Sequence, residues 1–389
     1  MRIAVIGAGT GGAAAALFLA RKGHSVEVFE RVSDPKPVGA GILLQPTGMQ
    51  VMAALGLLAP ILAHGARIDR LDGVTLSGRK VIELAYDDIA PGLFGLGIHR
   101  GVLFETLYGA LRAENISVRT GISVDRLDAG PDGVAVAGEW FDRVVVADGA
   151  RSQLRPAFAR MRRYPWGALW CMLPEDARYV GTLSQVYRDT RRMVGFLPTG
   201  RPPGGGAPLV SMFWSLRADA VPAWKAAGID VWKGEVHEIA PFVDLAAVGA
   251  GDVLFAPYFD VVMPRWHTDR VVWIGDCGHA MSPQLGQGAN LALMDAMVLG
   301  ECGSFAEYSD RRRAHLRFYQ FASRWLTPFF QSSFPVLSPF RDTFAMPFHR
   351  WGWYRRQMLL SLAGVKTGLF STLSTVPLLP PPSDGGATG

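Results

Sequence analysis

Cysteine is scarce in this chain, which has only three among 389 residues: Cys171, Cys277 and Cys302. They are widely spaced and form no Cys-x-x-Cys pair, so the sequence excludes a disulfide framework and a structural zinc site. No metal is expected. A reducing cytoplasm is the simplest location for such a protein.

Charge of either sign is also sparse, because charged residues make up 19% of the chain and hydrophobic residues 49%. This balance allows a large buried core and excludes a disordered chain. The formal net charge is +5, but only six of the 39 basic residues are lysine and no long basic run occurs. Nucleic-acid binding is therefore not expected. At roughly 100–200 residues per domain, the length predicts two closely joined domains.

The chain lacks an uninterrupted apolar run of the ~20 residues that a membrane-spanning helix needs. The closest candidate, residues 358–379, is interrupted by Gly364, Lys366 and Gly368. Before it, residues 318–354 carry thirteen aromatic residues and four prolines. We favour helices that pack over the active-site domain, with peripheral membrane contact or a dimer surface as the alternatives.

Glycine, by contrast, is abundant at 45 residues, and one cluster directly follows an apolar strand predicted at residues 2–6. A helix and a second strand ending in Glu30 come next, which completes the dinucleotide-binding fingerprint. Gly7 permits the turn, Gly9 lets the backbone approach a pyrophosphate, and Gly12 permits close packing of helix and strand. Glu30 is expected to accept hydrogen bonds from an adenosine ribose. The fingerprint by itself leaves NAD and FAD open.

The rest of the pattern predicts two domains that are interleaved along the chain. Helices are predicted at 49–57 and 103–112, and residues 144–147 are typical of a buried parallel strand. Residues 181–216 alternate in the manner of an antiparallel sheet. The sequence therefore predicts an α/β fold: a Rossmann-like domain with an interleaved antiparallel β-sheet and helices at the C-terminal end.

Three further segments carry a resemblance to a known family. They are Val146-Ala-Asp-Gly-Ala-Arg-Ser152, His99-Arg100-Gly-Val-Leu103, and the long segment from Val271 to Asn290 that contains Gly275-Asp-Cys-Gly-His279. With the Gly7–Gly12 loop, and in this order and spacing, they resemble the group A flavoprotein monooxygenases of the p-hydroxybenzoate and salicylate hydroxylase type, over about residues 1–300. Two small departures occur, because the family usually has glycine where this chain has Val146, and Gly-Asp-Ala-Ala-His where it has Gly275 to His279.

The resemblance implies FAD as the bound cofactor. Asp276 is implied to bind the ribityl hydroxyls, and the loop from Pro283 to Gly288 to lie beside the flavin ring. The helix from Ala289 is implied to direct its N-terminus at the N1–C2=O edge of the ring. The complete set of implied cofactor-binding residues is Gly7, Gly9, Gly12, Glu30, Arg31, Arg100, Asp148, Gly149, Gly275, Asp276, Pro283, Gly286, Gly288, Ala289 and Asn290.

The resemblance also implies a division of the chain. The FAD-binding domain comprises residues 1–72, 98–165 and 263–303, and the β-sheet substrate domain comprises residues 73–97 and 166–262. Residues 304–379 form a helical, aromatic-rich segment. Residues 380–389 are expected to be a loose tail.

The implied activity is that of a monooxygenase. NADPH or NADH is the transient reductant, molecular oxygen forms a C4a-hydroperoxyflavin, and an aromatic or lipophilic small molecule is hydroxylated or epoxidised. The candidate substrate-facing residues are Tyr187, Met212 and Trp214, of which alternate ones must point away. No catalytic side chain is identified, although Tyr86, His99 and Tyr258 are weak candidates for a base.

Two alternatives share the FAD scaffold. One is an FAD-dependent oxidoreductase or dehydrogenase without oxygen transfer. The other is a flavin-dependent halogenase, which this chain does not favour because it lacks the Trp-x-Trp-x-Ile-Pro pattern of those enzymes.

Overall fold

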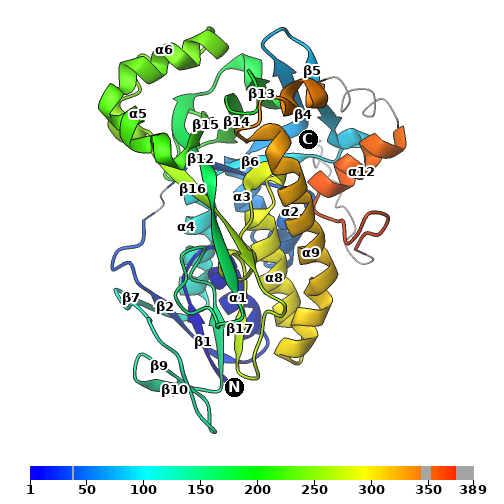
Figure 1. The fold of residues 1–389 in the computed structure, drawn as a ribbon. Coiled ribbons are helices and arrows are strands. Elements are labelled where there is room, and N and C mark those ends of the chain that lie inside the picture. The colour runs from blue at the N-terminus through cyan, green and yellow to red at the C-terminus, as the bar shows by residue number, and fades with distance from the viewer. Residues whose placement is uncertain (37–38, 343–351, 374–389) are drawn as a thin grey trace, which may run out of the picture.

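The computed structural model describes residues 1–36, 39–342 and 352–373, which form two large sheets and the helices that cover them (Figure 1). The predicted tail, 380–389, lies outside the described residues. One sheet lies beside the N-terminus, at the bottom of Figure 1, and the other lies at the top. The long helix α9 (Phe305–Phe330) runs along the side of the molecule between them.

The lower sheet is parallel, and its strand order is β17-β11-β1-β2-β7. Its strands are β1 (Arg2–Ile6), β2 (Ser25–Glu30), β7 (Ser117–Thr120), β11 (Arg143–Val146) and β17 (Val271–Trp273). The central strands are mainly apolar because a parallel sheet is covered on both faces. The predicted fingerprint strand and the strand at 144–147 are thus β1 and β11, and they pair with each other.

Helices and a small sheet pack against this parallel sheet. The helices are α1 (Thr10–Arg21), α4 (Arg100–Ala113) and α8 (Gly288–Glu301), and α1 lies beside both of the others. The small antiparallel sheet contains β8 (Asp128–Ala129), β9 (Val134–Val136) and β10 (Glu139–Phe141). Its Phe141 ring meets Phe29 of β2 edge to face, with 5.7 Å between the ring centroids. The nucleotide-binding half therefore has a three-layer core.

The upper sheet has nine strands in the order β16-β12-β15-β14-β13-β4-β6-β3, with β5 paired to β4. The strands are β3 (Gly41–Leu44), β4 (Ala66–Thr75), β5 (Lys80–Ala85), β6 (Gly95–His99), β12 (Arg160–Pro174), β13 (Gly181–Tyr187), β14 (Met193–Gly200), β15 (Leu209–Arg217) and β16 (Leu254–Val262). Nearly all neighbours are antiparallel, and only β13 pairs with β4 in parallel. The predicted α/β fold with an interleaved sheet is confirmed, whereas the division into residue ranges stays a prediction.

The nine-stranded sheet curls so that its β3–β6 edge lies against β14. A Cβ at Gly97 of β6 would overlap the carbonyl oxygen of Pro198, and one at Gly41 of β3 would overlap the side chain of Thr199. The backbone N–H of Gly41 also donates to the Ser211 hydroxyl of β15 across 3.0 Å. Glycine at these two positions therefore permits the sheet to fold back on itself.

Helices cover the two faces of the curled sheet differently. The short helices α5 (Val221–Ala227) and α6 (Ile229–Ile239) cover the outer face, where Trp232 and Val236 join Trp214 in one buried cluster. On the inner face, α12 (Gly352–Leu362) contributes Leu359 to a cluster with Leu43 and other residues of the sheet. The other α-helices among the described residues are α2 (Pro46–Ala54), α3 (Leu58–His64), α7 (Asp276–His279) and α10 (Leu337–Phe340).

Helices α9 and α12 of the C-terminal part contact the sheets, whereas residues 343–351 and 374–379 of the predicted segments lie outside the described residues. Arg324 of α9 makes two hydrogen bonds of 2.9 Å to the carboxylate of Asp260 on β16. Two aromatic side chains of α9, Phe321 and Trp325, remain more than half exposed. Within the described ranges, every helix is too short or too polar to cross a membrane. Peripheral membrane contact and a dimer surface stay predictions.

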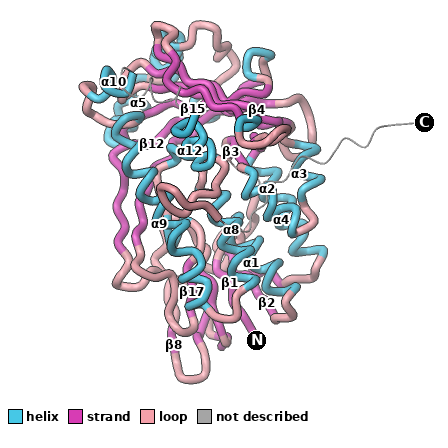
Figure 2. The backbone as a smooth tube through the Cα atoms, turned by 90° about the vertical axis from the view of Figure 1, so that its right-hand side faces the viewer, coloured by secondary structure: helices cyan, strands magenta, loops and turns pink. Residues whose placement is uncertain are grey.

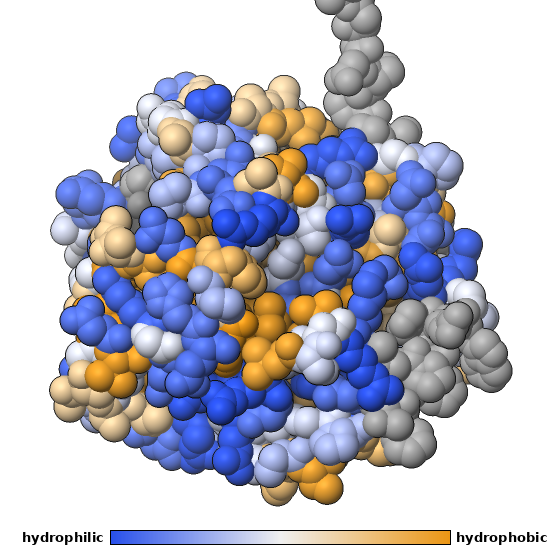
Figure 3. Space-filling view, turned by 90° about the horizontal axis from the view of Figure 1, so that it is seen from above, coloured by the Kyte–Doolittle hydropathy of each residue, from blue (hydrophilic) through white to orange (hydrophobic). Residues whose placement is uncertain are grey.

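The end of the molecule that carries the nine-stranded sheet has a mixed surface. Seen from above, apolar patches alternate with polar ones (Figure 3). Exposed apolar side chains on their own are normal on a globular protein.

The substitution Gly97→Ala tests the curl of the sheet. The added methyl group would push β6 away from β14, so we expect the free energy of unfolding to fall by about 1–3 kcal/mol. Chemical denaturation followed by circular dichroism measures this loss. Gly109→Ala in α4 is the matched control, because no atom lies within 4 Å of its added Cβ. If both variants are equally stable, the close contact between β6 and β14 is wrong.

Candidate active site

The loop between β1 and α1 contains two packed glycines and one open glycine. A Cβ at Gly7, where φ is +101°, would lie 2.6 Å from the carbonyl oxygen of Ala147, and one at Gly12 would overlap the carbonyl of Gly7. A Cβ at Gly9 would meet no atom within 4 Å. Helix α1 begins here without a side-chain cap, so its first N–H groups are free to bind an anion. The open space at Gly9 fits a pyrophosphate.

Glu30 lies at the end of β2, beside this loop. Its carboxylate accepts hydrogen bonds from the backbone N–H groups of Ala8 and Val32, both of 2.9 Å. These bonds fix the side chain against the glycine loop, and each carboxylate oxygen keeps a lone pair for a ribose hydroxyl. Arg31, the next residue, is exposed at the same strand end.

Asp148 follows β11 at the neighbouring strand end. Its Oδ1 atom is buried and has no hydrogen-bond partner in the described part of the chain. Burial raises the pKa of Asp148 above its usual range, although a hydrogen bond from Ser152 opposes this shift. Gly149 has a φ of +86° and open space around it. A buried acceptor without a partner beside an open glycine fits a ligand that donates hydrogen bonds.

Arg155 holds this loop, and sequence reasoning missed it. Its Nε donates to the carbonyl oxygen of Cys277 at 2.6 Å, and its terminal nitrogens donate to the carbonyls of Gly149, Ala150 and Ser152. One guanidinium thus joins the Asp148 loop to the loop after β17. Burial lowers the pKa of Arg155. No sequence spacing indicated this role, because the arginine acts on backbone carbonyls that come together only in the fold.

The loop after β17 places Asp276 and the predicted flavin-facing residues around open space. Gly275, with φ of +64°, turns the chain so that the Asp276 side chain is exposed. A Cβ at Gly288, the first residue of α8, would lie 3.8 Å from Asp276 Oδ1, and one at Gly286 would meet no atom within 4 Å. Helix α8 also begins without a side-chain cap. Two uncapped helix N-termini, of α1 and α8, therefore border the site.

Ala292 of α8 brings the two halves of this site together. A Cβ at Gly11 of α1 or at Gly275 would lie 3.3 Å from the Ala292 methyl group. The pyrophosphate region and the loop after β17 are thus adjacent. The open glycines, the unpartnered Asp148 oxygen and the two helix N-termini fit FAD, the cofactor that the resemblance implies.

Asn290 has a positioning role in the structure. Its buried amide accepts a hydrogen bond from the Gln45 N–H (2.8 Å) and donates to the carbonyls of Leu43 and Gly286 (both 3.0 Å). The side chain therefore ties the flavin-facing loop to β3 and α2. Its neighbour Ala289 is half-buried at the start of α8, and Pro283 is exposed at the start of the loop.

Arg100 is exposed at the start of α4, and its side chain lies beside Gly39. None of the three weak base candidates is suited to accept a proton from a substrate. His99 accepts a hydrogen bond from the Gly101 N–H as the helix cap, and burial lowers its pKa. Burial raises the pKa of both Tyr86 and Tyr258. The Tyr86 hydroxyl donates to Gln45 Oε1 at 2.6 Å.

A buried ionic cluster holds the loop after β17 in place. The Asp295 carboxylate accepts hydrogen bonds from His279 Nε2 (2.5 Å), Arg312 Nε (2.7 Å) and the Gly275 N–H (2.8 Å). Burial alone would raise the pKa of Asp295, but His279 and Arg312 outweigh it and hold that pKa below its usual range. His279 is thus a structural partner of Asp295.

Arg312 extends this cluster to His315. A guanidinium can only donate, so it fixes His315 Nδ1 as the acceptor and leaves the ring proton on Nε2, 2.7 Å from the carbonyl oxygen of Gly364. Burial, and then the charge of Arg312, holds the pKa of His315 well below its usual range. The ring is therefore neutral and its tautomer is fixed.

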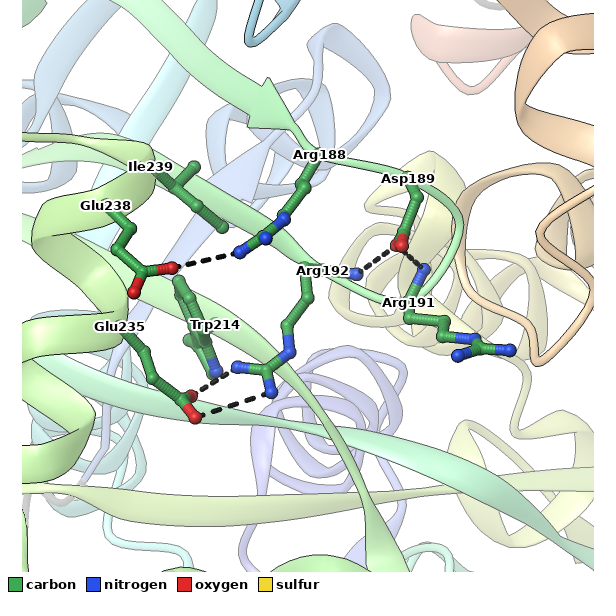
Figure 4. Close-up of a pocket in the computed structure, with 8 residues that line it drawn as sticks. All are labelled: Arg188, Asp189, Arg191, Arg192, Trp214, Glu235, Glu238 and Ile239. Carbon is green, nitrogen blue, oxygen red and sulfur yellow. Dashed lines mark hydrogen bonds and ion pairs between the residues drawn. The ribbon is translucent and has the colours of Figure 1, made fainter.

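The predicted substrate residues of β15 face away from this site. Met212 and Trp214 lie in the outer cluster with Trp232 of α6. Trp214 lines a cavity of about 380 Å³, and Figure 4 shows the residues around it. The charged residues around that cavity are Arg188, Asp189, Arg191, Arg192, Glu235 and Glu238. Because this cavity lies on the outer face, we do not carry Met212 and Trp214 forward as substrate contacts.

The inner face carries Phe213 and Trp170 instead. They are opposite each other on β15 and β12, half-buried, with ring centroids 4.9 Å apart. Tyr187, the third predicted residue, also lies inside, where its ring contacts Phe330 of α9 at 5.5 Å. Alternation alone does not say which residues of a strand point inward, so the sequence could not choose between Phe213 and its neighbours.

The open space at Gly9 leads to a first prediction for the site. Because φ is −69° there, the substitution Gly9→Val introduces no backbone strain, and we expect the FAD-free protein to keep its stability within about 0.5 kcal/mol. The side chain would occupy the phosphate space, so the affinity for FAD should fall by roughly 100-fold, or about 2.7 kcal/mol. Titration of the FAD-free protein, followed by flavin fluorescence, measures this. Unchanged affinity would place the phosphates elsewhere.

The neutral ring of His315 leads to a pH prediction. In the unfolded chain a histidine takes up a proton below about pH 6.5, whereas the folded protein keeps His315 neutral. The unfolded state then binds more protons, so the free energy of unfolding falls as the pH drops, by up to about 1.4 kcal/mol per pH unit for this group. The variant His315→Gln cannot titrate and should show a shallower loss between about pH 6.5 and 5.

Denaturation at several pH values measures this slope. His24→Gln is the control, because the His24 ring is only half-buried and should contribute less to the change of unfolding free energy with pH. An unchanged slope in His315→Gln would mean that this ring is not the group that titrates.

Comparison with known proteins agrees with the geometry. A family model described as "FAD binding domain" matches residues 1–201 and 246–309. The chain is 30% identical over 318 residues to a 3-amino-4-hydroxybenzoate 2-monooxygenase of Streptomyces cremeus, covering 78% of each chain. It is 30% identical over 326 residues to an FAD-dependent urate hydroxylase of Klebsiella pneumoniae, covering 77% of this chain and 80% of the relative.

Solved structures share the fold. Klebsiella pneumoniae HpxO complexed with FAD and uric acid aligns with a TM-score of 0.77 and 22% identity, over 93% of this chain and 97% of that one. The tetrameric form of 2-methyl-3-hydroxypyridine-5-carboxylic acid oxygenase aligns with a TM-score of 0.71 and 21% identity, over 93% and 95% of the two chains. Together with the family match over more than half of the sequence, these findings show that the chain belongs to the group A FAD-dependent aromatic monooxygenases.

Proposed function

We propose that this protein hydroxylates a small, planar, electron-rich aromatic molecule, with FAD as bound cofactor, NADPH or NADH as reductant and molecular oxygen as co-substrate. The observation that carries the substrate class is the pair of half-buried rings on the inner face, Trp170 and Phe213. Half-buried aromatic rings in the middle of a sheet offer a flat apolar surface against which another ring can stack.

Two bridges hold this aromatic surface near the flavin-facing loop. On one side, Gln284 of the loop donates to Gln331 Oε1 at 3.4 Å, and the Gln331 amide donates to the carbonyl of Gly167 and to the Ser215 hydroxyl of the sheet. Ser215 lies two residues from Phe213 and therefore on the same face of β15. The aromatic pair thus faces the side on which the loop lies.

On the other side, the loop is joined to the sheet through α12. Gln287 donates to the carbonyl of Leu362 at 2.6 Å, and Leu362 packs in the inner cluster with Leu43 and Leu197, against which Phe213 also packs. A ring between the loop and Phe213 would contact this apolar cluster, which excludes water from that side.

Several residues around this space are suited to bind FAD and to stabilise charge on it. FAD, when bound, supplies the redox and oxygen-activating chemistry that no amino-acid side chain can perform. The uncapped N-terminus of α8, which begins two residues after Gly286, would offer N–H groups and a positive dipole end to negative charge on a flavin bound there. Asp276 offers its exposed carboxylate to hydroxyl groups. Arg31, Arg100 and Asp148 complete the proposed cofactor contacts.

The relatives support an aromatic ring with polar substituents. They are named for 3-amino-4-hydroxybenzoate, urate and 6-hydroxynicotinate. These relatives are hydroxylases or monooxygenases, which does not favour a dehydrogenase without oxygen transfer or a halogenase. An amino or hydroxyl group already on the ring supplies the electron density that electrophilic hydroxylation needs.

A pair of neighbouring substitutions tests the proposed substrate face. Phe213→Leu removes the stacking ring, which is worth about 0.5–1.5 kcal/mol, so kcat/KM should fall by about two- to tenfold. Met212→Leu changes the adjacent residue on the opposite face and should have little effect. NAD(P)H consumption is measured with a panel of phenols and anilines, and mass spectrometry follows incorporation of labelled O2.

Three outcomes of this test would contradict the proposal. Equal effects of the two substitutions would place the substrate elsewhere. Substrate-stimulated NAD(P)H oxidation without labelled oxygen in any product would favour the dehydrogenase. Turnover of non-aromatic lipophilic molecules alone would exclude the proposed substrate class.

A further inference from the structure

The C-terminal end of α12 is held by an unusual set of hydrogen bonds. Four successive backbone carbonyls at this end each accept a bond from a different buried side chain. The bonds run from the Tyr319 hydroxyl to Ser361 O (2.8 Å), from Gln287 Nε2 to Leu362 O (2.6 Å), from the Thr47 hydroxyl to Ala363 O (3.3 Å) and from His315 Nε2 to Gly364 O (2.7 Å).

These donors meet only in the folded chain. Thr47 lies in the first turn of α2, Gln287 lies in the flavin-facing loop, and His315 and Tyr319 lie one turn apart on α9. The last carbonyls of a helix have no partner within the helix and are usually satisfied by water or by the following turn. Here the helix end is buried, so side chains of three other elements provide the bonds.

Gly364 lets the turn after α12 approach the loop this closely. Its φ is +89°, and an added Cβ would overlap the Thr47 hydroxyl and lie 3.1 Å from Gln287 Oε1. The position therefore needs glycine for its backbone conformation and also for its lack of a side chain.

The other contacts of α12 tie it to the substrate half. Leu359 and Leu362 pack in the inner cluster with Leu43, Tyr86 and Leu197. In Figure 2, α12 lies beside the nine-stranded sheet, with α9 on one side of it and α2 on the other. The helix thus spans from the proposed substrate face to the loop that Gln287 belongs to.

The flavin-facing loop begins with a 3-10 turn at Pro283–Leu285 and ends with two glycines. Gly286 has a φ of +61° and open space around it, and Gly288 follows Gln287. Glycines give a loop many accessible conformations, so fixing it costs conformational entropy unless other bonds have already done so. Side chains provide such bonds: Asn290 donates to the carbonyl of Gly286, Gln284 donates to Gln331, and Gln287 donates to the end of α12.

We propose that residues 361–364 at the end of α12 form a clamp that fixes the flavin-facing loop in its FAD-binding conformation, with Gln287 as the positioning residue. This inference rests on the proposed function, because it requires that FAD lies beside Gly286 and Gly288. A loop that is fixed before binding loses less entropy when the cofactor arrives, so the clamp strengthens FAD binding without touching FAD.

Two glycine variants of equal backbone strain test the clamp. Gly364→Ala displaces the turn from Thr47 and Gln287, and the dissociation constant of FAD, titrated into the full-length FAD-free protein, should rise at least fivefold. Gly228→Ala is the matched control, because Gly228 has a φ of +87° but no atom within 4 Å of an added Cβ. It should lose comparable stability through backbone strain, yet bind FAD within twofold of the unmodified protein.

A second pair of variants applies if Gly364→Ala does not fold. Gln287→Met removes the bond to Leu362 and keeps the length of the side chain. Tyr319→Phe removes the bond that its hydroxyl donates to Ser361 O and the one that it accepts from the Lys366 N–H, and neither bond reaches the loop. Only Gln287→Met should weaken FAD binding. Its effect should be at least fivefold, measured by flavin fluorescence.

The outcomes separate the clamp from the proposed function. If FAD binds equally to both members of each pair, the clamp is overturned while the flavin site stands. If the affinity falls equally in both members, the effect is general destabilisation and the clamp is again overturned. If the unmodified protein binds no FAD, the proposed function fails and the clamp fails with it.

Discussion

The buried carboxylate of Asp295 is the interaction on which the rest of the site depends. It accepts hydrogen bonds from the Gly275 N–H just after β17, from His279 Nε2 and from Arg312 Nε. Removal of one partner of such a pair leaves an uncompensated buried charge and typically costs about 3–5 kcal/mol. Because Arg312 also sets the tautomer of His315, this single carboxylate connects the strand end that carries Asp276 with helix α9 and with the turn after α12.

Glycine has two different roles in this fold. At Gly12, Gly41 and Gly97 the neighbouring backbone or side chain already occupies the space of a Cβ, so glycine permits close packing. At Gly9 and Gly286 the same space is open. The packed glycines permit close contacts within the scaffold, whereas these two open glycines border the proposed cofactor space. The high glycine content therefore serves both the fold and the site.

The two faces of the curled sheet have different roles. The outer face carries an apolar core under α5 and α6, bordered by a cavity with charged walls, while the inner face carries the half-buried rings of Trp170 and Phe213. Helix α12 closes the inner face and reaches the loop through Gln287. The C-terminal segment, which the sequence left open between packed helices, a membrane surface and a dimer surface, thus contributes directly to the proposed site.

The sequence by itself determined the parts of this protein that depend on local order along the chain. The strand–glycine–helix–acid pattern around Gly7 to Glu30 and the motif around Asp276 each fold from consecutive residues, so the family, the fold class and the cofactor were all predictable. Only the tertiary structure decided that Phe213 rather than Trp214 faces inward, because a shift of one residue in strand register exchanges the two faces. The same holds for Arg155, Asp295 and the carbonyls at the end of α12, because their partners lie far away in the sequence and meet only when the chain is packed.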